Sequence, residues 1–127
     1  MRVDPTGILG RLLSWYGLLG APFAWTAFHV AGVGIATGVC SPFGTRGGGD
    51  VQPATLALTF GTLAVAVGGL VAALLVYLAT RGVDEEGAPP LGRIHFLAVV
   101  GLAIAPLFIA IILMAGLGGT ALGCEQG

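Results

Sequence analysis

Residues 12–40 read LLSWYGLLGAPFAWTAFHVAGVGIATGVC and contain no Asp, Glu, Lys or Arg. As an α-helix this run would be about 43 Å long, which is enough to cross a hydrocarbon core of about 30 Å. A secretory signal peptide has an apolar core of only about 7–15 residues. We therefore expect the segment to be retained as a transmembrane helix.

Two further apolar segments follow, at residues 54–80 and 93–119. The sequences between them, SPFGTRGGGDVQP and RGVDEEGAPPLG, are rich in glycine, proline and charge, which predicts loops. Backbone groups in lipid need internal partners, and the segments lack the alternation of barrel strands. We therefore expect an all-α integral membrane protein whose 127 residues form one three-helix domain, with spans at 12–39, 54–80 and 93–119.

The composition agrees with a membrane protein, because 56% of the residues are hydrophobic and 9% are charged. Soluble domains carry about 25% charged residues. The net charge of −1 and the scattered arginines do not favour a nucleic-acid partner. Asp84, Glu85 and Glu86 are expected to form a solvated loop, and a docking contact with a basic partner is the alternative reading.

The arginines predict how the chain is oriented in the membrane. Arg2 and Arg11 precede the first span, Arg81 and Arg93 bracket the second loop, and Arg46 alone lies on the other side. Cytoplasmic loops carry the excess of basic residues. We therefore expect a cytoplasmic N-terminus and a periplasmic or extracellular C-terminus.

The two cysteines, Cys40 and Cys124, follow the outer ends of the first and third spans in this topology. An oxidising compartment permits them to form a disulfide, and we expect this pairing. Two unpaired thiols are the alternative. A metal site is not expected, because two thiolates without a nearby histidine are too few ligands.

His29 is the ionisable residue inside an apolar segment, about 16 Å along the helix from Cys40. Such residues often mark a proton path, a ligand or a partner contact. Trp25 lies one turn earlier, and Gly32 and Ala36 extend the same face, which can receive a haem, a quinone or a carotenoid. A neutral histidine, hydrogen-bonded to a carbonyl or a threonine at a helix contact, is the simpler interpretation, and it is the one we favour.

His95 follows Arg93 closely and is expected at the cytoplasmic boundary, with its side chain extending to the interface beside that arginine. His29 should lie about 12 Å or more deeper, so the two histidines are not expected to ligate one haem iron from opposite faces.

Small residues at Ala64, Gly68 and Ala72 repeat every four positions and predict a shallow stripe for a neighbouring helix. Pro22 predicts a bend or local loosening near residues 18–22. The sequence shows no paired carboxylates, no nucleophile beside a base and no phosphate loop, so we expect neither an enzyme nor a resident cofactor.

The sequence GAPFAW at residues 20–25, with Cys40 after the span and Cys124 near the end, resembles a group of small three-helix bacterial inner-membrane proteins. These proteins show a Gly-x-Pro-x-x-Trp first helix and a C-terminal cysteine, and their genes often lie near those of haem-copper oxidases. The glycine-rich outer loop and His29 depart from that pattern. The resemblance implies the bacterial inner membrane and association with a respiratory complex.

Together these observations predict a non-catalytic accessory subunit that packs on other integral membrane subunits and on lipids. Trp25 and His29 are the candidate contact to a lipid, a quinone or a haem edge. A small homo-oligomeric transporter or channel, or an oxidase assembly factor, is the alternative function.

Overall fold

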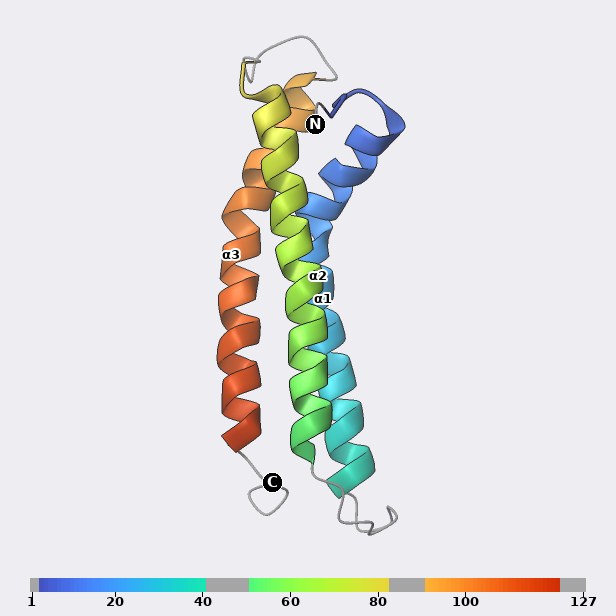
Figure 1. Ribbon diagram of the computed structural model, residues 1–127, viewed down its shortest axis with the longest axis vertical. Helices are drawn as coiled ribbons and strands as arrows, with labels where there is room; N and C mark the ends of the chain where they lie inside the picture. Colours follow the sequence, from blue (N-terminus) through green and yellow to red (C-terminus); the bar gives the residue numbers. More distant parts are fainter. Residues whose placement is uncertain (1–2, 41–50, 83–90, 122–127) are drawn as a thin grey trace.

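The computed structural model contains three long helices, α1 (Ile8–Cys40), α2 (Val51–Thr80) and α3 (Leu91–Ala121), packed side by side along their length (Figure 1). The structure describes residues 3–40, 51–82 and 91–121. Each helix is long and apolar enough to cross a membrane, and each predicted span lies inside one of them. The predicted all-helical class and the three candidate membrane spans are thus confirmed.

A hydrogen-bonded turn starts α1 four residues before the predicted span. The Asp4 carboxylate accepts hydrogen bonds from the amide of Thr6 at 3.0 Å and from its hydroxyl at 2.7 Å. The amide of Gly7 donates to the Asp4 carbonyl at 3.3 Å, and the amide of Arg11 donates to the Gly7 carbonyl at 3.0 Å. The turn therefore continues directly into the helix, so hydrophobicity alone placed the start of α1 too late.

The buried positions advance along each helix in alternating steps of three and four residues. The steps run through positions 10, 14, 17, 21, 24 and 28 on α1, 59, 62, 66, 69, 73, 76 and 80 on α2, and 94, 98, 101, 105 and 112 on α3, where half-buried position 108 completes the steps. Positions 20, 72, 92, 95 and 116 are buried beside these steps. A buried face that repeats every 3.5 residues keeps facing its neighbours over many turns, as in coiled coils and four-helix bundles. This repeat explains why the three helices stay in contact along the bundle.

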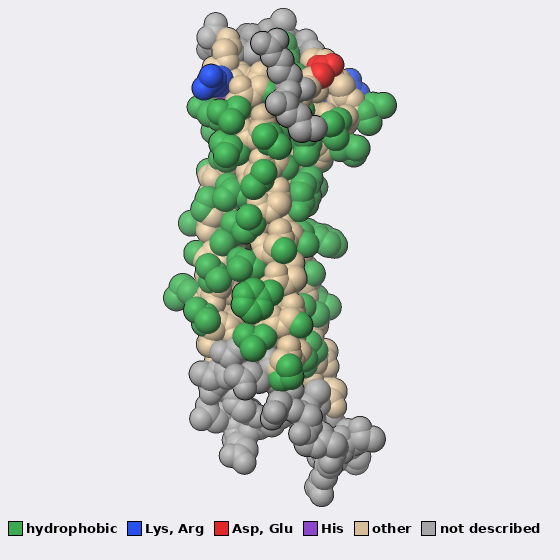
Figure 2. All heavy atoms as spheres, in the orientation of Figure 1, with side chains coloured by type: hydrophobic (Ala, Val, Ile, Leu, Met, Phe, Trp, Pro, Cys, Tyr) green, Lys and Arg blue, Asp and Glu red, His purple; other side chains and the backbone are tan. Residues whose placement is uncertain are grey.

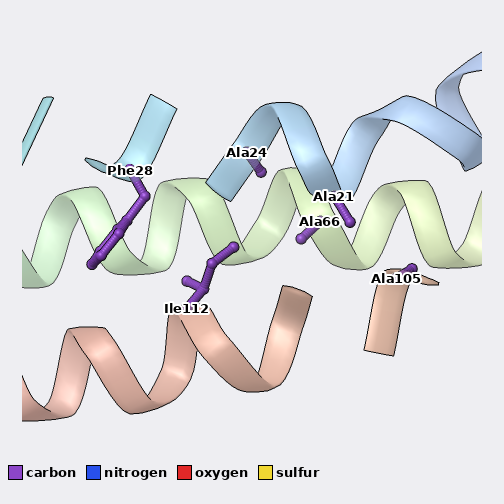
Figure 3. Packing of buried hydrophobic residues seen from close by; sticks show 6 residues of the cluster. All are labelled: Ala21, Ala24, Phe28, Ala66, Ala105 and Ile112. Carbon is purple, nitrogen blue, oxygen red and sulfur yellow. The ribbon is translucent and has the colours of Figure 1, made fainter. Parts of the chain in front are cut away.

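Small side chains dominate the interior. The larger of two buried clusters draws on all three helices and consists of Ala21, Ala24, Phe28, Ala66, Ala105 and Ile112 (Figure 3). The second consists of Val76, Ile94 and Ala98. In lipid, apolar helices associate mainly through van der Waals packing, which small residues improve by letting the backbones approach.

The closest approach of the three backbones lies at a group of glycines. A Cβ atom on Gly101 of α3 would lie 2.7 Å from the carbonyl oxygen of Gly17 on α1. A Cβ on Gly17 would lie 2.8 Å from the amide nitrogen of Ala73 on α2, and one on Gly69 would lie 3.4 Å from the Cα of Gly20. At Gly101 and Gly17 the neighbouring backbone therefore leaves no room for a larger residue, and the contact of Gly69 with Gly20 is an ordinary van der Waals distance. We call these five residues the glycine crossing.

The predicted stripe at Ala64, Gly68 and Ala72 is wrong as a contact face. Ala64 is exposed and Gly68 only half-buried, whereas Ala72 is buried. The contact face of α2 runs instead through the buried positions of the 3.5-residue repeat, including Gly69 and Ala73. Small residues occur on both faces of α2, so their four-residue spacing alone did not identify the buried one.

Both helices that contain an internal proline continue through it, at Pro22 of α1 and at Pro106 of α3. The first turns of α1 lean away from α2 and α3 (Figure 1). These turns precede residues 18–22, where the sequence predicted a bend. The charged side chains of the described residues gather at this same end, and hydrophobic side chains are spread over the described body of the bundle (Figure 2). In the described part of the chain, the bundle therefore has a polar end, where α1 and α3 begin, and a long apolar body (Figure 2).

Candidate functional site

Trp25 and His29 form the centre of the candidate site, as the sequence predicted. Their ring centroids are 4.6 Å apart, with an angle of 50° between the ring planes. The His29 side chain is exposed on the surface of the bundle, whereas Trp25 is half-buried and packs against the larger core cluster. The half-buried indole thus contacts the exposed imidazole from the side of the bundle interior.

A backbone hydrogen bond fixes which nitrogen of His29 carries hydrogen. Nδ1 lies 3.0 Å from the carbonyl oxygen of Trp25, one turn earlier on the same helix. A carbonyl oxygen can only accept, so Nδ1–H is the donor. In the neutral imidazole, Nε2 then has a free lone pair. The site therefore presents a hydrogen-bond acceptor in an apolar part of the surface.

Two phenylalanines complete the surroundings. The ring centroid of Phe28 lies 5.5 Å from that of His29, edge to face, and the centroid of Phe108 on α3 lies 5.7 Å from that of Trp25. Aromatic pairs at these separations attract one another. The Nε1 atom of Trp25 is buried and has no hydrogen-bond partner among the described residues. The aromatic group of Trp25, Phe28, His29 and Phe108 thus joins α1 to α3. Within the described residues, its Trp25 Nε1–H donor has no acceptor.

The predicted extension of this face toward Gly32 and Ala36 is only partly described. Gly32 is half-buried, and a Cβ atom there would meet nothing within 4 Å. The side chain of Ala36 lies outside the described residues. The surface beside Gly32, one turn from His29, is therefore open.

Neighbouring hydroxyls on the exposed side of α1 bond to their own helix. The Thr26 hydroxyl donates to the Pro22 carbonyl at 3.0 Å, and the Thr37 hydroxyl donates to the Val33 carbonyl at 2.8 Å. Thr26, His29, Val33 and Thr37 are spaced by three, four and four residues and share one helix face. The hydroxyl donors of this face are thus bonded within α1. They are not available to Nε2 of His29, which can accept a hydrogen bond.

His95 occupies a different environment from the predicted one. Its side chain is only 8% exposed, and its Nδ1 lies 2.9 Å from the hydroxyl oxygen of Thr80 on α2. The Thr80 hydroxyl donates its one hydrogen to the Val76 carbonyl at 2.8 Å, so we assign His95 Nδ1–H as the donor to Thr80. His95 also stacks on Tyr77, with centroids 5.4 Å apart.

The prediction that His95 extends to the interface beside Arg93 is therefore wrong. A hydroxyl and an aromatic ring on α2 provide a polar partner and a flat surface inside the bundle, so the imidazole has no need to reach water. His29 and His95 lie against different rings and different carbonyl or hydroxyl partners. Within the described residues, no group of three or more His, Cys, Asp or Glu side chains is placed to hold a metal ion.

The predicted Cys40–Cys124 disulfide remains a prediction, because Cys124 and the Cys40 side chain lie outside what the structure describes. The acidic residues 84–86 also lie outside it. The last turn of α1, which contains Cys40, and the end of α3 at Ala121 lie at the same end of the bundle (Figure 1). This arrangement is compatible with the pairing.

We expect peptide mapping without reductant to find Cys40 and Cys124 in one cross-linked peptide pair. After reduction, both cysteines should react with a thiol reagent. If both cysteines are labelled before reduction, the disulfide does not form.

Comparison of the chain with protein-family models, with curated proteins and with solved structures found no match.

Proposed function

We propose that this chain is a non-catalytic accessory subunit that packs on a larger membrane complex and stabilises it. The observation that carries the proposal is the exposed His29 imidazole, whose Nε2 lone pair has no donor among the described residues once Nδ1 is bonded to Trp25. A polar atom without a hydrogen-bond partner in lipid costs free energy. A donor from a partner subunit removes that cost.

The packing of the bundle supports a subunit over an independent transporter. The backbones of all three helices meet at the glycine crossing, and alanines fill most of the interior of the larger cluster. A substrate path through one chain would need space between the helices, and at the glycine crossing a single added Cβ atom would already meet the neighbouring backbone. The polar group available to a partner is therefore on the outer surface of α1.

The wider assignment follows from the resemblance of residues 20–25 and the two cysteines to small bacterial inner-membrane proteins. We propose a multi-pass protein of the bacterial inner membrane with its N-terminus in the cytoplasm. Arg11, Arg81 and Arg93 at the polar end support this orientation through the positive-inside rule. The partner complex is then a respiratory electron-transfer complex, such as a haem-copper oxidase, where Trp25 and His29 would contact a lipid, a quinone or a haem edge.

Purification in a mild detergent, followed by native mass spectrometry, tests the proposal. We expect the chain to copurify with other integral membrane subunits in a fixed ratio. His29→Leu should weaken that association about fivefold, since one hydrogen bond contributes about 1 kcal/mol. Phe60→Leu is the matched control, because Phe60 is an exposed apolar residue on α2.

Four outcomes would contradict the proposal. A free monomer would argue against any stable partner. Multiples of this chain alone would favour the homo-oligomeric transporter or channel, and purification only with an immature oxidase would favour an assembly factor. Equal association of the His29→Leu and Phe60→Leu variants would show that His29 is not the contact.

A further inference from the structure

A hollow of about 270 Å³ lies between the first turns of α1 and α3, at the polar end of the bundle. It is lined by Arg11, Ser14 and Trp15 of α1 and by Arg93, Ile94 and Leu97 of α3. The sequence identified both arginines only as markers of orientation. Their placement around one hollow comes from the packing of α1 against α3.

Both guanidinium groups are available to a ligand. Arg11 and Arg93 are exposed, and neither forms an ion pair with a carboxylate in the described part of the chain. The nearest described acid along α1, Asp4, is engaged elsewhere. Hydrogen bonds from the hydroxyl and the amide of Thr6 hold the pKa of the Asp4 carboxyl below its ordinary value. Among the described residues, the hollow therefore holds two positive charges that no carboxylate pairs with.

The ends of the two helices add to this positive character. Neither α1 nor α3 has an acidic residue in its first turn. The N-terminal end of a helix carries a partial positive charge that favours anions. The two N-terminal ends and the two arginines thus lie at the same end of the bundle (Figure 1), and the Asp4 carboxylate, bonded to Thr6, lies just before the start of α1.

The remaining walls of the hollow are suited to lipid. Trp15 is 56% exposed, and tryptophan is enriched where the headgroups meet the hydrocarbon. Ile94 is buried and Leu97 half-buried, so the wall formed by α3 is largely apolar beside Arg93. The hollow thus combines positive charge with apolar surface. A phospholipid likewise combines a charged phosphate with apolar acyl chains.

We propose that this hollow binds the phosphate of an anionic phospholipid headgroup. Arg11 and Arg93 approach the phosphate from two helices, and Trp15 covers the glycerol region. Guanidinium groups form charge-assisted hydrogen bonds to phosphate oxygens, and basic pockets between transmembrane helices are a known form of headgroup site. Pockets for whole drug-sized ligands hold about 300–1,000 Å³, so this hollow suits a headgroup while the acyl chains lie along the apolar surface outside.

Native mass spectrometry of the full chain, titrated with phosphatidylglycerol or with phosphatidylcholine, tests the proposal. We expect one phosphatidylglycerol to bind at least fivefold more tightly than phosphatidylcholine. Arg11→Gln and Arg93→Gln should each weaken phosphatidylglycerol binding about fivefold, because an arginine near an anionic lipid surface contributes about 1 kcal/mol. The Arg11→Lys, Arg93→Lys double variant should retain most of the binding, since it keeps both charges.

Arg81→Gln is the matched control, because Arg81 is exposed at the same end but does not line the hollow. It should leave phosphatidylglycerol binding unchanged. Inorganic phosphate at the same concentration should not displace the lipid, and if it binds as tightly as phosphatidylglycerol, the ligand is a soluble anion and the proposal fails. Equal binding of the two lipids, or an equal loss in the Arg81→Gln variant, would also overturn it.

Discussion

Replacing Gly101 by alanine should destabilise the bundle by about 1–3 kcal/mol, the range for overpacking a filled interior. The new Cβ atom would lie 2.7 Å from the carbonyl oxygen of Gly17 and 3.1 Å from its carbonyl carbon. Both atoms belong to the backbone, so no flexible side chain can turn aside, and α1 and α3 must move apart. Equilibrium unfolding in mixed micelles, followed by circular dichroism, measures the loss.

Gly61→Ala is the matched control for this prediction. Gly61 lies within α2, and an added Cβ atom would meet nothing within 4 Å. Alanine favours helix over glycine by about 1 kcal/mol, so this variant should be as stable as the wild type or slightly more stable. Gly17→Ala, whose Cβ would lie 2.8 Å from the amide nitrogen of Ala73, should behave like Gly101→Ala. If all three variants had the same unfolding midpoint, close backbone packing at the glycine crossing would not contribute to stability.

The helices themselves were predictable because the two loops interrupt uncharged apolar runs with glycine, proline and charge. The start of α1 was not, since it depends on hydrogen bonds to the Asp4 carboxylate and not on hydrophobicity. Which side of α2 is buried was also missed. The signal was present in the alternating three- and four-residue spacing of Thr59, Thr62, Ala66 and Gly69, but small residues on the other side obscured it.

The candidate site was partly predictable for a similar reason. Trp25 and His29 are four residues apart on one helix, so local geometry alone brings their rings together, and the structure confirms that contact. The contact with Phe108 depends on the rotation and depth of α3 relative to α1, which no spacing within one helix specifies. The sequence favoured a hydrogen bond from His29 to a carbonyl or a threonine at a helix contact. The structure shows a carbonyl partner, but it is that of Trp25 on the same helix, and His29 is exposed.

For His95, the signal lay in the connection between α2 and α3. Thr80 is the last residue of α2 and His95 is the fifth residue of α3, so an antiparallel hairpin places them at similar depth. Proximity to Arg93 in sequence pointed instead to the interface. The structure shows that a partner on the facing helix outweighed proximity to the charged end, because the buried hydroxyl of Thr80 and the ring of Tyr77 both contact the imidazole.

Thr80→Val should therefore destabilise the chain by about 1–2 kcal/mol. Valine has nearly the same shape as threonine but removes the oxygen that accepts from Nδ1 of His95. Thr80 is fully buried and His95 is 8% exposed, so water cannot replace the lost acceptor. A buried donor left without a partner costs about 1–3 kcal/mol, and hydrogen bonds between membrane helices fall toward the lower part of that range. The same unfolding measurement in mixed micelles reports the change.

A double-mutant cycle distinguishes the lost hydrogen bond from a change in packing. Thr80→Ser keeps the hydroxyl and should retain more stability than Thr80→Val, although it loses a methyl group. His95→Phe preserves a ring that can stack on Tyr77 and removes the donor, so adding it to Thr80→Val should recover part of the loss. Strictly additive effects of Thr80→Val and His95→Phe would mean that the 2.9 Å contact contributes nothing to stability, and α2 and α3 would then be held at this level by van der Waals packing alone.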